Sequence, residues 1–261
     1  SDLGAKKEMN WTGMILPIAS GFGITVATMP LFIGYFQIKK YGQEILEEGP
    51  NWHQAKAGTP TMGGTVFLIA IIISALWVAV WQPALTPALW ISLFILLVYG
   101  GLGFLDDFIK IFRKRNMGLN SKQKLIGQII GGIIFYAVLV SEGATNTVNV
   151  FGYDLHLSFL YGLFVIVWLV GFSNAVNLTD GIDGLVSGLG AISFATYAII
   201  AWNQQQYDIL ILCLSVVGAL IGFFGYNHKP AKIFMGDVGS LALGGLLATI
   251  SILLHQEWTL L

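Results

Sequence analysis

Long apolar segments with almost no charged residues recur along this sequence, and they limit the folds that it can adopt. Each segment is close to the length of about 20 residues that a helix needs to cross the hydrocarbon core of a bilayer. Only 10% of the 261 residues are charged and 56% are hydrophobic, whereas soluble domains carry roughly 25% charged residues. We therefore expect the chain to lie in a membrane.

The segments predict an all-α polytopic membrane protein with about eight transmembrane helices in a single integral domain, residues 1–261. They are apolar around their whole circumference, which is not the pattern of amphipathic surface helices. The expected spans are 11–38, 62–81, 87–105, 125–140, 157–175, 185–202, 209–226 and 241–254.

Basic residues alternate between the two sets of loops that these spans would create. Eleven lie between spans one and two, three and four, or seven and eight, and the only others are Lys6 and Lys7 in the N-terminal tail. Because basic loops of membrane proteins stay in the cytoplasm, we expect the N-terminus to lie outside and the basic loops inside.

Two adjacent carboxylates, Asp106 and Asp107, follow the third predicted span in the sequence Gly-Leu-Gly-Phe-Leu-Asp-Asp-Phe. Adjacent charges at a membrane boundary are costly unless a cation or a basic group compensates them. Carboxylates are suitable ligands for Mg²⁺, which commonly joins one or two of them to substrate phosphates. The alternative is an acidic pair that only ends the helix, and the pair by itself favours neither interpretation.

A dense polar segment follows the fifth span and reads Asn-Ala-Val-Asn-Leu-Thr-Asp-Gly-Ile-Asp-Gly-Leu from residue 174 to 185. It places Asn174 with Asn177, and Asp180 with Asp183, at the three-residue spacing that puts two side chains on one helix face. Its glycines permit tight turns close to a ligand. A substrate site explains this segment better than a hydrogen-bonded structural turn does.

Two more polar segments precede the second and the eighth span. In the first of them, Lys56 and Thr61 lie just before a helix start, where backbone N–H groups favour anions. The other contains Asn227, Phe234 and Asp237. The ring of Phe234 could stack on a nucleotide base or anchor the loop at the membrane interface, and composition alone favours the anchor.

All of these segments fall on one predicted membrane face, together with Lys122 and Lys124. Carboxylates beside lysines and glycine-rich turns suit a site for Mg²⁺ and a diphosphate, where catalysis depends on positioning and on neutralising phosphoryl charge. The carboxylates of a proton-coupled transporter would be expected in the middle of the spans. We therefore expect a phosphoryl-transfer enzyme, with an ion-coupled transporter and a non-catalytic scaffold as alternatives.

Four stretches resemble the polyprenyl-phosphate N-acetylhexosamine-1-phosphate transferases, in the order expected for that family. Asp-Asp at 106–107 and Asp-Gly-Ile-Asp-Gly at 180–184 are typical of the whole family. Gly-Thr-Pro-Thr-Met-Gly-Gly at 58–64 and Asn-Ala-Val-Asn-Leu-Thr-Asp-Gly at 174–181 resemble its muramoyl-pentapeptide branch. Phe-Met-Gly-Asp-Val-Gly-Ser at 234–240 completes the match.

This resemblance implies that UDP-N-acetylmuramoyl-pentapeptide is the donor, that undecaprenyl phosphate is the acceptor, and that lipid I and UMP are the products. It also implies a requirement for Mg²⁺, a place in the bacterial inner membrane, a cytoplasmic active site and a homodimer. A transferase of N-acetylglucosamine-1-phosphate to a polyprenyl phosphate is the alternative within the family.

The resemblance further implies a role for each matching residue. The catalytic residues would be Asp106, Asp107 and Asp237, with Asp106 as the base that deprotonates the lipid phosphate and with Asp107 and Asp237 as the Mg²⁺ ligands. Phe234 would stack on uracil. We favour direct attack by the lipid phosphate, because phosphoryl transfer needs little covalent help. The other substrate contacts would come from Lys56, Thr61, Lys122, Lys124, Asn174, Asn177, Asp180, Asp183 and Asn227.

Members of this family have about ten spans and a His-His-His motif in the last cytoplasmic loop. The present sequence reaches Leu261 after eight predicted spans. We therefore expect one membrane domain without the family's C-terminal helices and without the histidines that would help to close the substrate site.

Overall fold

The computed structural model describes residues 9–42 and 57–261. In this part of the chain eight helices are long and apolar enough to cross a membrane, which confirms the predicted all-α polytopic class. The helices are α1 (Trp11–Ile38), α3 (Gly64–Trp81), α4 (Pro87–Phe112), α5 (Ser121–Ser141), α6 (Tyr161–Thr179), α7 (Leu185–Asn203), α8 (Tyr207–Asn227) and α9 (Gly236–Leu253).

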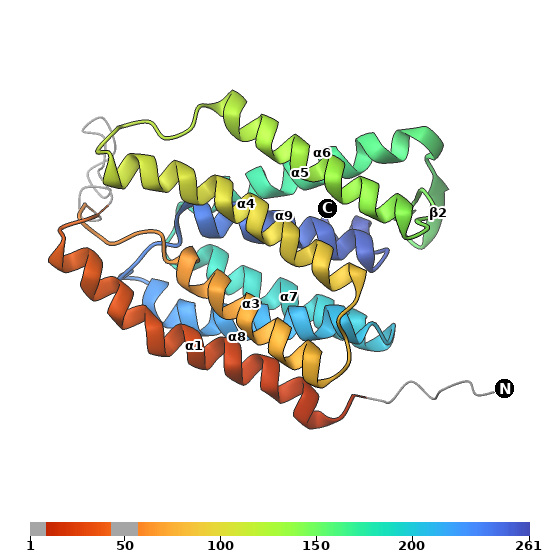
Figure 1. Cartoon of the computed structure of the whole chain (residues 1–261), viewed down its shortest axis with the longest axis horizontal. Coiled ribbons are helices and arrows are strands. Elements are labelled where there is room, and N and C mark those ends of the chain that lie inside the picture. The colour runs from red at the N-terminus through yellow and green to blue at the C-terminus, as the bar shows by residue number, and fades with distance from the viewer. Residues whose placement is uncertain (1–8, 43–56) are drawn as a thin grey trace.

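The helices lie side by side along a common direction, so successive connections alternate between two ends of the bundle (Figure 1). The α4–α5, α6–α7 and α8–α9 connections share one end, which we call the site end. Helix α9 packs against α4 and α6, and α8 packs against α1 and α7. In its apolar window α9 is 83% buried and α1 only 22%, so α9 is central and α1 faces mostly lipid.

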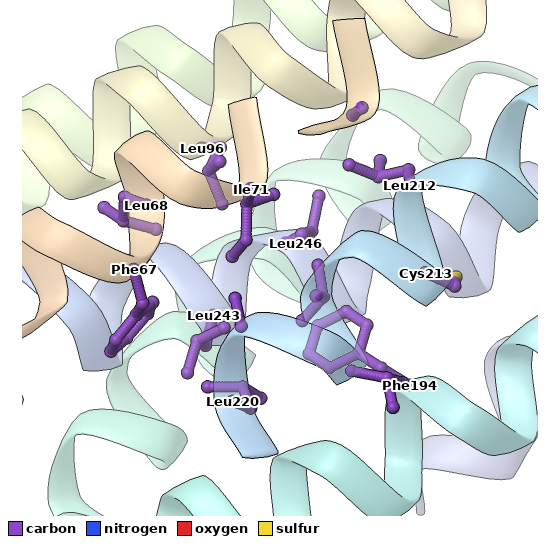
Figure 2. Packing of buried hydrophobic residues seen from close by; sticks show 14 of the residues in the cluster. Phe67, Leu68, Ile71, Leu96, Phe194, Leu212, Cys213, Leu220, Leu243 and Leu246 are labelled. Carbon is purple, nitrogen blue, oxygen red and sulfur yellow. The ribbon is translucent and has the colours of Figure 1, made fainter. Parts of the chain in front are cut away.

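The interior between these helices is filled by leucine, isoleucine and phenylalanine side chains. Figure 2 shows Phe67, Leu96, Phe194, Leu220 and Leu243 converging from five different helices. Lipid tails are as apolar as leucine, so close packing rather than transfer out of water holds membrane helices together. Small residues therefore occupy the closest helix crossings: a Cβ atom on Gly218 of α8 would lie 2.1 Å from the backbone oxygen of Ile18.

Four helices extend beyond the predicted spans by at least four residues at the site end, among them α5, which begins at Ser121 rather than near residue 125. Helix α4 continues to Phe112 rather than ending near residue 105, α6 continues to Thr179, and α9 already begins at Gly236. The predicted spans therefore stopped short of Asp106, Asp107, Asn177 and Asp237, which the structure places within the ends of these helices. Hydropathy drops at these residues, but their side chains find polar partners, so the backbone remains helical.

The connection before α6, which lies between the fourth and fifth predicted spans, forms a β-hairpin. Strand β1 (Thr147–Val150) pairs antiparallel with β2 (Tyr153–His156), with Val150 opposite Tyr153. The two turn residues, Phe151 and Gly152, have φ values of 50° and 89°, as the favoured two-residue hairpin turn requires. A short 3₁₀-helix, η1 (Ser158–Leu160), then leads into α6.

A buried carboxylate joins this hairpin to the 3₁₀-helix η2 (Glu257–Leu260), beyond the last span. The side chain of Glu257 is fully buried, and its Oε2 accepts a hydrogen bond of 3.2 Å from the backbone N–H of Asn149. Burial, aided by the negative charge of Asp154, raises the pKa of Glu257 to about 7. The folded state therefore prefers the protonated form of this carboxyl group.

The crossing of α1 and α8 predicts a difference between two Gly→Ala substitutions. Gly218→Ala should lower the thermal unfolding midpoint in detergent by several degrees, because the new methyl group collides with backbone. Gly23→Ala on α1 is the matched control, since a Cβ there meets nothing within 4 Å and alanine is the better helix former. Equal midpoints for the two variants would contradict the close crossing.

Glu257 predicts a pH dependence of stability. Because its folded pKa is raised, its stabilising contribution is complete below the unfolded value near pH 4.5 and is lost as pH rises through about 7. The thermal midpoint of the wild type should therefore fall between pH 5 and pH 8 by more than that of Glu257→Gln. The exposed Glu142→Gln is the control and should keep the wild-type profile. Parallel profiles for wild type and Glu257→Gln would refute this role.

Candidate active site

Three carboxylates meet at the site end, where α4 crosses the first turn of α9. One oxygen from each of Asp106, Asp107 and Asp237 lies within 4.8 Å of the others. The crossing is close because Gly103 faces the backbone of Asp237. A Cβ on Gly103 would lie 2.2 Å from the backbone carbonyl oxygen of Asp237. The absence of a side chain at Gly103 therefore allows the first turn of α9 to reach the acidic pair of α4.

Asp107 stabilises the start of α9. Its Oδ2 accepts a hydrogen bond of 3.1 Å from the backbone N–H of Val238, one of the free N–H groups of the first helical turn. Gly236, with φ of 74°, lies so close that a Cβ on it would be 2.5 Å from the same oxygen. A negative charge at a helix N-terminus is also favoured by the helix dipole. Asp107 therefore contributes to the fold as well as to the carboxylate cluster.

Asp106 is fully buried and is surrounded by cationic and N–H groups. Its Oδ1 lies 3.1 Å from Nζ of Lys124 and accepts a 2.9 Å hydrogen bond from the backbone N–H of Leu119. Its Oδ2 pairs with Nζ of Lys110, one helical turn along α4. These contacts hold the carboxylate in one orientation and connect α4 to the start of α5.

Asp237 shares both lysines with Asp106. Its Oδ2 lies 3.1 Å from Nζ of Lys124 and 3.7 Å from Nζ of Lys110. Its Oδ1 accepts a hydrogen bond of 3.0 Å from Nδ2 of Asn177, which also donates to Oγ of Ser240 at 2.8 Å. Three carboxylates thus face two ammonium groups. When all five groups are ionised, one negative charge is left, which favours a bound cation.

The other predicted polar segments adjoin this cluster. Oδ2 of Asp183 accepts a hydrogen bond of 3.0 Å from the backbone N–H of Ala231, which ties the α6–α7 connection to the α8–α9 connection. Phe234 is half-buried, and its backbone N–H donates to the carbonyl of Pro60 at 2.8 Å. Asp180 follows directly after α6. The predicted meeting of these segments at one end of the bundle is confirmed.

Two predicted substrate contacts have side chains that already bind other parts of the protein. The amide of Asn227 accepts from Gly184 N at 3.1 Å and from Ser187 Oγ at 2.9 Å, and donates to the carbonyl of Ile233 at 3.0 Å. The amide of Asn174 pairs with Gln128. In this structure both asparagines therefore join segments of the chain, and their contact with substrate stays a prediction.

Three other predicted substrate contacts are Thr61, Lys122 and Lys56. Thr61 is buried, three residues before the start of α3 at Gly64. Lys122 is exposed, and the ion pairs found among residues 9–42 and 57–261 do not include it. Lys56 lies outside the described residues.

This end of the bundle also includes three contributors that were not predicted, Lys110, Gln128 and Ser240. Lys110 was counted only as a basic loop residue, although its spacing of four residues from Asp106 is that of a helical ion pair. Gln128 interrupts an apolar span and could have been noticed as an uncharged polar residue at membrane depth. Ser240 gave no comparable signal in the sequence.

Two family models match this sequence, and together they cover the helices and loops that form the carboxylate cluster. A family model described as glycosyl transferase family 4 matches residues 89–255, which include the three carboxylates and both lysines. A second model, phospho-N-acetylmuramoyl-pentapeptide-transferase signature 1, matches residues 56–68, the segment that enters α3.

Curated relatives agree over nearly the whole chain. A phospho-N-acetylmuramoyl-pentapeptide-transferase of Enterococcus hirae is 71% identical over 254 residues, and one of Enterococcus faecalis is 67% identical over 254 residues. Each alignment covers 97% of this chain and 79% of the relative. An enzyme of the same name from Latilactobacillus sakei is 61% identical over 253 residues, covering 96% of this chain and 79% of the relative. The chain therefore belongs to the phospho-N-acetylmuramoyl-pentapeptide-transferase family.

Proposed function

We propose that this protein transfers phospho-N-acetylmuramoyl-pentapeptide from its UDP carrier to undecaprenyl phosphate, which gives lipid I and UMP. The observation that carries the proposal is the cluster of Asp106, Asp107 and Asp237 held against two lysines. The names of the relatives support the muramoyl-pentapeptide donor over N-acetylglucosamine. The transporter and scaffold alternatives lose their support, because a catalytic family is matched over most of the chain.

The carboxylate cluster suits Mg²⁺. Carboxylate oxygens are the ligands that this ion prefers, and it usually completes its shell with water and substrate phosphate. Asp237, Asp107 and Asp106 each offer an oxygen within 4.8 Å of the others, and the lysines leave one of the three charges uncompensated. When bound, the ion would neutralise charge on the diphosphate of the donor.

The reaction can be written as a direct displacement. An oxygen of the lipid phosphate attacks the phosphorus that carries the muramoyl sugar, and the bond from that phosphorus to the bridging oxygen of the donor breaks. The bridging oxygen leaves with its electron pair as part of UMP. Positioning and charge stabilisation supply most of the catalysis in such transfers, so the protein needs to hold both phosphates rather than to form a covalent intermediate.

Lys110 and Lys124 are placed to hold those phosphates. Each ammonium group bridges Asp106 and Asp237, so a small shift brings it to an incoming phosphate while it keeps one carboxylate partner. Asp106 then has an oxygen available to accept a proton from the lipid phosphate. This assigns charge stabilisation to the lysines and the role of base to Asp106.

The same proposal places the protein in the bacterial inner membrane with the site end towards the cytoplasm, because the UDP-linked donor is water-soluble and is made there. The alternation of basic loops supports this orientation, with the N-terminus outside. A homodimer is the assembly that the family resemblance implies, and it remains part of the proposal.

Asp237→Asn should lower Mg²⁺-dependent release of UMP by at least about 100-fold, because it removes a charge that faces both lysines. The assay uses UDP-N-acetylmuramoyl-pentapeptide and a polyprenyl phosphate in detergent, with this chain and with a form extended to the relatives' full length. The exposed Arg115→Ala is the control and should react at the wild-type rate. Release of UMP by wild type from UDP-N-acetylglucosamine alone would reject the proposed donor.

Asp106→Asn should show a defect that depends on pH. The second ionisation of a phosphate monoester lies near pH 6, so the lipid phosphate needs a base below that pH and much less help above it. The ratio of wild-type to variant kcat should therefore fall about fourfold between pH 5.5 and pH 8.5, because the dianionic fraction of the phosphate rises from roughly a quarter to nearly one. A kcat ratio that does not change with pH would show that Asp106 does not act as the base and contributes only its charge.

A further inference from the structure

A layer of buried polar side chains lies inside the membrane-spanning part of the bundle, beneath the carboxylates. Its centre is Gln128 of α5, which is 1% exposed. Its Nε2 donates to Oγ of Ser173 at 2.8 Å and to Oδ1 of Asn174 at 3.3 Å, and its Oε1 accepts from Nδ2 of Asn174 at 3.2 Å. The two amides thus form a reciprocal pair that joins α5 to α6.

The layer also includes α4. The hydroxyl of Tyr99 donates to the backbone oxygen of Gln128 at 2.8 Å. The Tyr99 ring lies where side chains on Gly131 of α5 and Gly245 of α9 would be, since a Cβ on either would come within 3.0 Å of it. The layer therefore connects α4 to α5 and α5 to α6, the helices that carry Asp106, Lys124 and Asn177.

The amide pair lies directly below the groups that hold Asp237. Gln128 follows Lys124 by four residues on α5, and Asn174 precedes Asn177 by three residues on α6. Residues at these spacings share a helix face, and one helical turn places the amide pair about 5 Å deeper. Lys124 and Asn177 bind opposite oxygens of Asp237, Oδ2 at 3.1 Å and Oδ1 at 3.0 Å.

Apolar packing alone would leave the register of α5 against α6 loosely determined. Where these two helices approach, Gly132 of α5 faces Ile166 of α6, and a surface without a side chain at this point offers little resistance to sliding. A hydrogen bond between membrane helices stabilises by only about 0.6 kcal/mol on average. The amide pair is therefore better explained by register than by stability, because only one alignment satisfies both amides.

We propose that Gln128 is a positioning residue for the transfer reaction. Through Asn174 it fixes the register of α5 against α6, and this register brings Lys124 and Asn177 together on Asp237. Asn174 then acts from below the site rather than by touching the substrate. The kinetic part of this inference rests on the proposed function, whereas the geometric part does not.

The test removes the amide while keeping its bulk. Gln128→Leu should lower kcat for UMP release about tenfold or more, with little change in KM for the donor and in the thermal midpoint. The swapped double variant Gln128→Asn with Asn174→Gln restores two amides of the same combined length and should recover much of kcat. The control is Ser251→Ala, which removes another interhelical hydrogen bond, the 3.0 Å contact from Trp168, and should behave as wild type.

A second readout needs no transferase activity. In the wild type Lys124 is paired with two carboxylates, whereas Lys122, two residues away, is exposed. Acylation of lysines followed by mass spectrometry should show several-fold faster labelling of Lys124 in Gln128→Leu, with Lys122 and Lys110 unchanged. If wild type and Gln128→Leu differ in labelling as expected but wild type releases no UMP, the proposed function fails while the positioning role stands.

Three outcomes would overturn the inference. Unchanged labelling of Lys124 in Gln128→Leu would show that the amide pair does not position it. A raised KM for the donor with unchanged kcat in Gln128→Leu would show that Asn174 contacts the donor directly. A loss of activity matched by an equal loss of folded protein, with faster labelling of all lysines, would make Gln128 a residue of general stability only.

Discussion

Electrostatic repulsion among three carboxylates, of which Asp106 and Asp107 are buried and Asp237 is partly buried, is the constraint on which the site end of this protein depends. Carboxylates less than 5 Å apart in a poorly polarisable interior would force the helices that carry them apart. Lys110 and Lys124 prevent this, because each lies between Asp106 and Asp237 and compensates both. The bundle can therefore place acidic groups at the crossing of α4 and α9.

The same contacts that maintain the fold also orient the chemical groups. Asp107 binds the first turn of α9, and Asp183 binds the connection that leads into it. Asn227 holds the start of α7 against the α8–α9 connection. A substitution at one of these positions therefore affects folding and activity together. By contrast, the exposed Lys122 is free of such contacts in the described part of the chain, so its effect on activity can be measured by itself.

Hydropathy and motif order were sufficient to predict the class of fold, the eight apolar helices found in residues 9–42 and 57–261, and the gathering of the polar segments. They failed at the helix ends, because an apolar window stops at the first charged residue and cannot know that Asp106 will meet Lys124 from another helix. Pairing of this kind depends on tertiary contact. The partnership of Gln128 with Asn174 was missed for the same reason. The hairpin is local, but its turn depends on backbone angles at Phe151 and Gly152 that composition does not reveal.

The lysines shared by Asp106 and Asp237 would couple the binding of a cation to the binding of a phosphate ligand. A divalent cation that took up the carboxylate oxygens would release both ammonium groups from their partners, and the released groups would attract a diphosphate. A diphosphate bound first would in turn draw the lysines away and leave the carboxylates more attractive to a cation. Metal and nucleotide would then strengthen each other's binding by the same factor, because a coupling free energy between two sites is reciprocal.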